Sequence, residues 1–409
     1  MTRNEAVILG TGALLLFAAM VINPWMLSRL LERDLVHLDL RLMIFAVEFA
    51  LAISGLLLVV HRKTLKVANI ALAGFVILLC GSLLLTIDMW LAGVKIDNSV
   101  TYIKDVNEVD ARLGWKPRPG TGRHFYRGLF DVTYGIDADG LRKMPGVPHP
   151  DFNLFFFGDS FTFGHGVADQ KTYSYVIAER YLDDRVNIHN AGVMGYGMTQ
   201  IYLRFLEVEN RIGHGDLVIL APLTEDLTRN YETFAERTAL RNLMLSNGSE
   251  GSQQLRNYPD FSDGTFQYRE LPQTLTLSQG LWSRAINAPV SGALFRTLSG
   301  GAAKRQRAVD QSLIMLNLIA EKTHAKGARF ALVFLPRNNE CLTRTYSLNV
   351  SRFQYLDLMD KFPSDRDGLD RLIFKGEGHW NDEGQRVAAR AMVSVLVEAN
   401  LIERRYLRD

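Results

Sequence analysis

An apolar run that ends at a serine constrains the fold of this chain more than any other feature. Leu154 to Phe157 is followed at once by Gly158, Asp159 and Ser160. Such a run predicts a buried strand, and open α/β sheets bind their ligands at the carboxyl ends of their strands. The pattern therefore predicts Ser160 as a nucleophile at that edge. An ordinary turn followed by a helix cap is the alternative interpretation.

The second half of the chain alternates between strand-like and helix-like patterns. Short apolar runs at 186–188, 217–220 and 330–334 predict strands, and helical periodicity falls at 173–181, 199–210, 308–322 and 382–399. This alternation predicts an α/β domain over 151–405, with a parallel sheet and helices on both faces. Residues 231–301 do not fit the alternation. We interpret them as an inserted cap, and a long irregular excursion is the alternative.

Two later stretches accompany the Gly-Asp-Ser turn. One runs from Asn190 to Gly197 and the other from Glu377 to Gly384. The order and spacing of the three stretches resemble the blocks of the SGNH (GDSL) hydrolase superfamily, over about residues 153–399. The resemblance implies a flavodoxin-like fold and an acyl-transfer reaction at a serine. It also implies that no metal or organic cofactor takes part.

The resemblance further implies a catalytic triad. Ser160 would be the nucleophile, and His379 would take its proton while an acid orients the imidazole. Family members usually place an Asp two or three residues before this histidine. Here Gly376 lies three before and Glu377 two before, so Glu377 is the predicted acid, although its extra methylene leaves the reach open. His165 lacks this context and is predicted to lie on the neighbouring surface.

An oxyanion hole is implied in the same way, from the backbone N–H groups of Ser160 and Gly195 and an Asn side chain of a third block. Glu225 stands where that Asn is expected, and an ionised carboxylate cannot donate a hydrogen bond. Losing one such donor typically costs about 100- to 1000-fold in turnover. Thr224 is the first replacement donor, and Asn338 or Asn339 after the later strand are further ones. The alternatives are a protonated Glu225 or a domain that binds without catalysis.

Three more residues, Asp159, Asn190 and Trp380, are predicted to contact substrate. Known cofactor and metal motifs are absent: the sequence has no Walker-type loop, no His-Glu-x-x-His and no paired cysteines for zinc. We therefore predict no metal and no cofactor. A formal net charge of +2 gives no nucleic-acid signature.

Residues 96–150 are interpreted as a linker and a β-extension. Asp139 and Gly140 predict a turn between two strands. Trp115 and Arg142 belong to a Gly-Trp-x-Pro and Gly-Leu-Arg lead-in that resembles SGNH-like proteins associated with bacterial exopolysaccharide. They would either contact sugar or brace the extension.

Three apolar runs, at about 6–28, 42–60 and 67–91, lie within residues 1–95. Each is long enough to span a bilayer, and a soluble core helix is the alternative for any one of them. The basic loop at 61–66 is typical of cytoplasmic loops. The pattern thus predicts three transmembrane helices in a bacterial inner membrane, with the C-terminal domain periplasmic or extracellular.

Together these features predict a membrane-anchored SGNH-like serine esterase or O-acyltransferase. Its substrate would be acyl groups, first of all acetyl, on an exported or cell-envelope polysaccharide. Hydrolysis and transfer share one acyl-Ser160 intermediate, so the sequence does not separate them. The alternative is a non-catalytic accessory subunit of a polysaccharide synthesis or export complex, docked to a synthase through its transmembrane helices.

Overall fold

The computed structural model describes residues 2–21, 38–61, 63–64, 74, 101–110, 112–231, 257–262, 265–270, 301–351 and 353–408. The chain divides into two compact units. One comprises Met1–Val94 and Gly280–Gly301, and the other Lys95–Gln279 and Ala302–Asp409. Every candidate site residue lies in the second unit.

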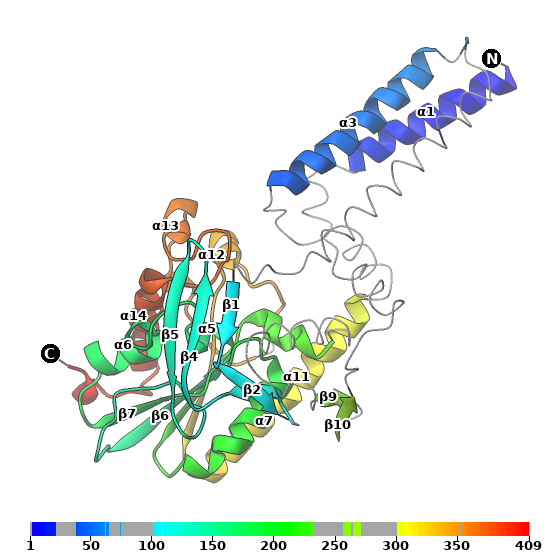
Figure 1. Ribbon diagram of the computed structural model, residues 1–409. Helices are drawn as coiled ribbons and strands as arrows, with labels where there is room; N and C mark the ends of the chain where they lie inside the picture. The colour runs from blue at the N-terminus through cyan, green and yellow to red at the C-terminus, as the bar shows by residue number, and fades with distance from the viewer. Residues whose placement is uncertain are drawn as a thin grey trace. The chain divides into compact units, whose positions relative to one another are not determined.

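The second unit is built on a five-stranded sheet in the order β12-β11-β8-β6-β7 (Figure 1). Its strands are β6 (Phe152–Gly158), β7 (Val186–Asn190), β8 (Leu217–Ala221), β11 (Arg329–Phe334) and β12 (Leu356–Asp357). All four pairings between them are parallel. The predicted parallel-sheet α/β domain is therefore confirmed.

Helices cover both faces of this sheet (Figure 1). They are α6 (Tyr173–Arg180), α7 (Met198–Val208), α11 (Gly301–Ala325) and α14 (Asp382–Glu398). The side chains of β6 alternate between two cores, since successive residues of a strand point to opposite faces. Phe155 and Phe157 pack in the core that includes α7 and α11, and Leu154 and Phe156 in the core that includes α6 and α14. Both faces of β6 are buried, so the strand reads as one continuous apolar run.

The β-extension consists of five strands: β1 (Thr101–Lys104), β2 (Asn107–Asp110), β3 (Gly114–Pro117), β4 (Gly120–Tyr126) and β5 (Phe130–Ile136). Strands β1, β4 and β5 form an antiparallel sheet, and β2 pairs with β3. The turn predicted at Asp139 and Gly140 is present, with Gly140 N–H donating to Asp137 O (3.1 Å). Beyond it the second strand is reduced to a single bridge between Ile136 and Arg142.

Shorter elements complete the second unit: α5 (Ser160–Phe163), α12 (Asn338–Thr343), α13 (Arg366–Asp370), the hairpin β9 (Asn257–Ser262) with β10 (Thr265–Glu270), and 3-10 turns at Asp169–Lys171, Glu209–Arg211, Thr224–Tyr231, Met359–Lys361 and Arg404–Tyr406. The hairpin falls within the insertion predicted at 231–301. Most of that insertion lies outside the described residues.

The first unit contains α1 (Arg3–Val21) and α3 (Leu38–Val60). These helices approach closely at Gly12 and Gly55. A Cβ added to Gly12 would lie only 2.9 Å from Gly55 O, so glycine is what permits the close approach. Within the described part of the chain, no helix has both the length and the apolar character required to cross a bilayer. The transmembrane helices predicted at 6–28 and 42–60 are therefore not supported over residues 6–21 and 42–60, and residues 22–28 lie outside the described residues. The run at 67–91 lies outside the described residues, except for residue 74.

Candidate active site

The nucleophile turn begins where β6 ends. Asp159 caps α5, and its carboxylate accepts a hydrogen bond from Phe161 N–H (2.9 Å). Gly158 passes so close to the neighbouring strand that an added Cβ would lie 2.5 Å from Ala221 O. Glycine is therefore required there, and the tight turn leaves Ser160 at the carboxyl edge of the sheet.

Three of the predicted residues meet at this edge. Ser160 Oγ lies 2.7 Å from His379 Nε2, and His379 Nδ1 lies 2.5 Å from Glu377 Oε1. The second carboxylate oxygen accepts the backbone N–H of His379 (2.9 Å), so the extra methylene of Glu does not prevent the contact. An ionised carboxylate only accepts hydrogen bonds, so His379 Nδ1 carries the proton. His379 Nε2 is then free to accept the Ser160 hydroxyl.

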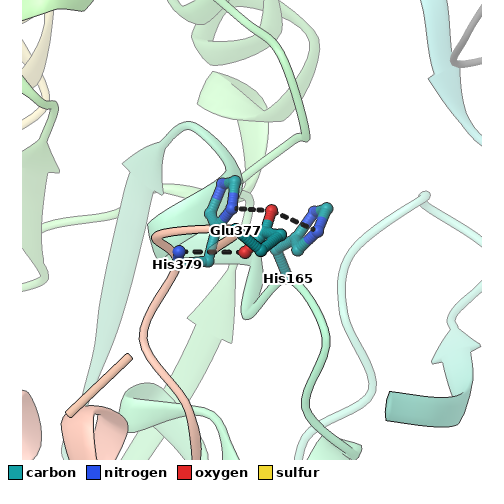
Figure 2. Close-up of side chains that lie close together, drawn as sticks. All are labelled: His165, Glu377 and His379. Atoms are coloured by element: carbon teal, nitrogen blue, oxygen red, sulfur yellow. Dashed lines mark hydrogen bonds and ion pairs between the residues drawn. The ribbon is translucent and has the colours of Figure 1, made fainter. Parts of the chain in front are cut away.

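His165 also belongs to this group (Figure 2). Its Nε2 lies 3.2 Å from Glu377 Oε1, and its ring stacks on that of His379 with centroids 4.0 Å apart. The side chain is only 12% exposed, so the prediction that His165 lies on the neighbouring surface is wrong. Gly164 and Gly166 both have positive φ, 83° and 78°, and turn the chain back over the site. This pair of flanking glycines is the sequence signal that could have revealed the residue.

Burial and neighbouring charges set the protonation states. The pKa of His379 is lowered to about 4, chiefly because burial disfavours its charged form and His165 lies close, against the opposing pull of Glu377. Burial alone would raise the pKa of Glu377. The hydrogen bonds from His165 and His379 outweigh burial and hold that pKa far below its usual range. Near neutral pH the site therefore holds a neutral base beside an ionised acid.

Glu225, at the expected Asn position, lies between two arginines. Its Oε1 accepts from Arg229 Nη2 (2.9 Å), and its Oε2 pairs with Arg337 Nη1. Burial would raise the pKa of this carboxyl, but the two guanidinium groups lower it below its usual value. With 40% of the side chain exposed, Glu225 is ionised, and the alternative of a protonated Glu225 does not hold.

Arg229 also faces two buried carboxylates beside the nucleophile. Its Nη1 lies 2.7 Å from Asp226 Oδ1 and 3.6 Å from Asp159 Oδ2. Burial and the charge of the other carboxylate raise the pKa of Asp226 well above its usual value. Arg229 was not among the predicted site residues, although its spacing of three and four residues from Asp226 and Glu225 on a helical turn is a recognisable signal.

The two remaining oxyanion candidates differ in their surroundings. The hydroxyl of Thr224 is buried and donates to Glu340 Oε1 (2.7 Å). Gly195 has a φ of 76°, in the left-handed region that favours glycine, within the turn closed by Tyr196 N–H and Val193 O. Val193 N–H donates to Gly158 O (3.1 Å), so this turn starts beside the end of β6.

The predicted substrate contacts face inward. Asn190 is completely buried, and its Nδ2 donates to Thr162 O (2.7 Å) and Ser174 Oγ (2.8 Å). Trp380 packs edge-on against Phe161 with ring centroids 5.0 Å apart. Asp159 is likewise buried as the cap of α5. In the structure these three side chains hold the loops of the site in place.

Trp115 and Arg142 brace the extension against the site. Trp115 Nε1 donates to Met194 O (2.9 Å), and both side chains are buried. Arg142 donates to Phe163 O (3.2 Å) and Val167 O (3.1 Å), at the two ends of the loop that carries His165. Of the two predicted roles, bracing is the one that these contacts support.

His165, Glu377 and His379 offer ligand atoms within 4.8 Å of one another. Two imidazoles and a carboxylate are donors that zinc accepts. In this arrangement, however, both imidazoles contact the carboxylate, and a metal would have to take the His379 Nδ1 atom that is hydrogen-bonded to Glu377. The contacts are those of a proton relay ending at Ser160.

No protein-family model matches the chain, and no curated protein matches it either. Two solved structures show a distant similarity, each covering 60% of this chain at 13% identity. One, from Desulfitobacterium hafniense DCB-2, is described as a lipolytic protein of the G-D-S-L family, is covered over 100% of its length and gives a TM-score of 0.33. The other, from Veillonella parvula DSM 2008, carries the same family description, is covered over 98% and gives a TM-score of 0.32. Similarities this distant carry no argument about activity, which rests on the geometry above.

Proposed function

We propose that this chain is a serine esterase or O-acyltransferase of the SGNH type. The observation that carries the proposal is the hydrogen-bonded series from Ser160 Oγ through His379 to Glu377, with distances of 2.7 and 2.5 Å. A serine hydroxyl beside a neutral, carboxylate-oriented imidazole is the arrangement that activates a nucleophile.

The reaction would proceed in two balanced steps. His379 Nε2 takes the proton of Ser160 as Oγ attacks the acyl carbonyl, and Glu377 stabilises the imidazolium. The imidazolium then returns the proton to the departing alcohol, which leaves an acyl-Ser160 ester. Water or a sugar hydroxyl attacks this ester with His379 again as base, and Ser160 regains its proton.

The oxyanion would be stabilised by the backbone N–H groups of Ser160 and Gly195. The turn of Gly195 beside the end of β6 supports this assignment. No side-chain donor from Glu225 is available, because that carboxylate is ionised. Positive charge from Arg337, which acts on His379 across the site, is the compensation that we propose.

The proposed substrate is an acylated, first of all acetylated, polysaccharide of the cell envelope or an exported polymer. The lead-in containing Trp115 and Arg142 supports it only by resemblance. The bacterial inner-membrane location, with this domain outside the cytoplasm, stays a prediction from the sequence. Resistance of the chain to carbonate extraction from membranes would test that location.

The central experiment is labelling of the full-length chain with a fluorophosphonate probe. We expect the wild type to be labelled and Ser160→Ala and His379→Ala to lose labelling, because the probe reacts with an activated serine. Ser351→Ala and His149→Ala, at exposed positions, are matched controls that should label normally. A folded wild type that does not react would contradict the proposal and favour the non-catalytic accessory subunit.

A second readout separates the two reactions. Unlabelled wild-type protein, once shown to react with the probe, is given a chromogenic acetyl ester with and without an oligosaccharide acceptor. Release of acetate alone indicates an esterase, whereas acetylated saccharide indicates an O-acyltransferase.

A further inference from the structure

The series from Ser160 through His379 to Glu377 leaves one neighbouring side chain, that of His165, without a role. Glu377 is contacted by two imidazoles, and only that of His379 takes part in the proposed proton transfer. We propose that His165 is a positioning residue for the reaction. Its Nε2–H donates to Glu377 Oε1 and its ring packs on His379, so that acid and base are both held in the orientation that proton transfer requires. The inference rests on the proposed serine chemistry at the same site.

The first support is the hydrogen-bonding of the carboxylate. Glu377 Oε1 faces His379 Nδ1 at 2.5 Å and His165 Nε2 at 3.2 Å, while Oε2 accepts the backbone N–H of His379 at 2.9 Å. Since an ionised carboxylate only accepts, both ring nitrogens that face it carry protons. This fixes the tautomer of both histidines. It leaves His379 Nε2 unprotonated toward Ser160.

The second support is the length of the acid. A glutamate side chain has one more rotatable bond than an aspartate, so it needs an additional contact to hold one orientation. His165 supplies that contact on the side of Oε1 away from His379 (Figure 2). A second donor is therefore what a glutamate requires to serve in this position.

The third support is that His165 is itself held rigidly. Its ring meets the edge of His124 on β4, with centroids 4.6 Å apart, and that of Phe130 at 5.5 Å. Next to it, Gly166 N–H donates to Tyr134 Oη (2.8 Å). A Cβ on Gly166 would lie 2.8 Å from the Phe130 ring, so the loop has no room for another path. The β-extension thus reaches the active site through His165.

Few charged or titratable groups of the described residues surround this pair, and Tyr134 on β5, whose hydroxyl accepts from Gly166 N–H, is one of them. His124 lies on β4, Arg337 precedes α12, and Glu377 lies between the two imidazoles. Burial lowers the pKa of His124 well below its usual value, so this ring stays neutral beside His165. The ionised group that His165 contacts directly is therefore Glu377.

Two amide variants test the proposal, because they differ by one methylene. In His165→Gln the side-chain amide reaches about as far as the imidazole Nε2, and it keeps a donor for Glu377. In His165→Asn the amide is too short to reach the carboxylate. Both are neutral and polar, so charge and size are nearly matched while the donor is not.

We measure the rate of fluorophosphonate labelling of the full-length chain as a function of pH. His165→Asn should react about tenfold more slowly than the wild type, the loss expected for one hydrogen bond to a charged group. The acid limb should move to higher pH in both variants, because His165 lowers the pKa of His379 and either substitution removes it. His165→Gln should stay within about threefold of the wild-type rate, because its amide keeps a donor for Glu377.

Two results would overturn the proposal. One is a His165→Asn variant with wild-type rate and pH profile. The other is an equal loss of labelling rate in both variants, which would mean that a donor to Glu377 contributes nothing and the imidazole ring is needed only for packing. Failure of the underlying reaction looks different, since the wild type itself would then not be labelled.

Discussion

At the scale of single residues, two glutamates stand where the resemblance to SGNH hydrolases leads us to expect other side chains, and the surroundings explain both. Glu377 replaces an aspartate, and its extra length is matched by contacts from His165 and from the backbone of His379. Glu225 replaces an asparagine, and two arginines keep it ionised. The first glutamate keeps the hydrogen-bonded series to Ser160 intact, and the second occupies an ion-pair cluster where a neutral donor is expected.

The pKa of His379 makes a prediction at this scale. The base acts only when neutral, and burial together with His165 lowers its pKa from the usual 6.5 to about 4. We therefore expect the labelling rate of the wild type to stay level as the pH falls through 6.5 and to reach half of its maximum near pH 4. Stopped labelling reactions across this range, with circular dichroism to verify folding, provide the measurement. Half-maximal rate already near pH 6.5 would show that the imidazole is not desolvated as described.

At the scale of elements, the site depends on the loop between α5 and the 3-10 turn that begins at Asp169. Arg142 binds the carbonyls of Phe163 and Val167 and pairs with Asp169 at 2.8 Å. Its guanidinium also lies over the ring of Tyr134, 4.3 Å from the centroid. One buried side chain of the β-extension thus fixes both ends of the loop that carries His165.

Removal of this clamp should be far more costly than removal of an exposed ion pair. Arg142→Met leaves Asp169 without its charged partner and two carbonyls without donors, and it should lower the free energy of unfolding by about 3 to 5 kcal/mol. The control is Arg123→Met, which breaks the exposed pair with Asp131 and should change stability little. Urea unfolding of both variants measures the difference. Equal effects would mean that Arg142 does not hold the loop.

At the scale of the whole molecule, folding withdraws several histidines from water. His189 on β7 stacks on Phe155 with centroids 4.5 Å apart, and burial and the nearby Arg211 lower its pKa to about 4. His124 and His379 are shifted in the same direction. The pKa of Asp226 is raised by burial, so the folded chain takes up a proton there at higher pH than the unfolded chain does. As the pH falls, this proton stabilises the fold and partly offsets the destabilisation by the three histidines.

The sign for His189 follows from linkage. Below its usual pKa of 6.5 the unfolded chain binds a proton that the folded chain refuses until about pH 4, so this group destabilises the fold as the pH falls. Its contribution amounts to about 3 kcal/mol at pH 4. We expect His189→Gln to be less stable than the wild type at neutral pH, and the gap to narrow by about that amount toward pH 4. Urea titrations at several pH values give the free energies of unfolding of both proteins. A difference between wild type and His189→Gln that stays constant with pH would contradict this account.

Much of the second unit could be predicted from the sequence because its signals are local. The apolar run of β6, the helical periodicities and the glycines around Ser160 depend on neighbours in the chain, and each gives the element that it predicts. The same holds for Glu377 and His379, since an acid two residues before a histidine can turn back to it within one loop. The three residues of the relay could therefore be predicted from two short motifs, the turn at Ser160 and the stretch that begins at Glu377.

Tertiary structure alone decided the rest. His165 and Arg229 acquire their roles from contacts with segments distant in the chain, and only the packing of the β-extension turns His165 toward Glu377. The pKa of Glu225 is lowered by Arg229, four residues away, and also by Arg337, which is 112 residues away along the chain and meets Glu225 only in the fold. The sequence by itself determined which elements form and which residues can carry the chemistry. The fold determined which charges face one another and how far they are buried from water, and electrostatic energies depend on both distance and burial.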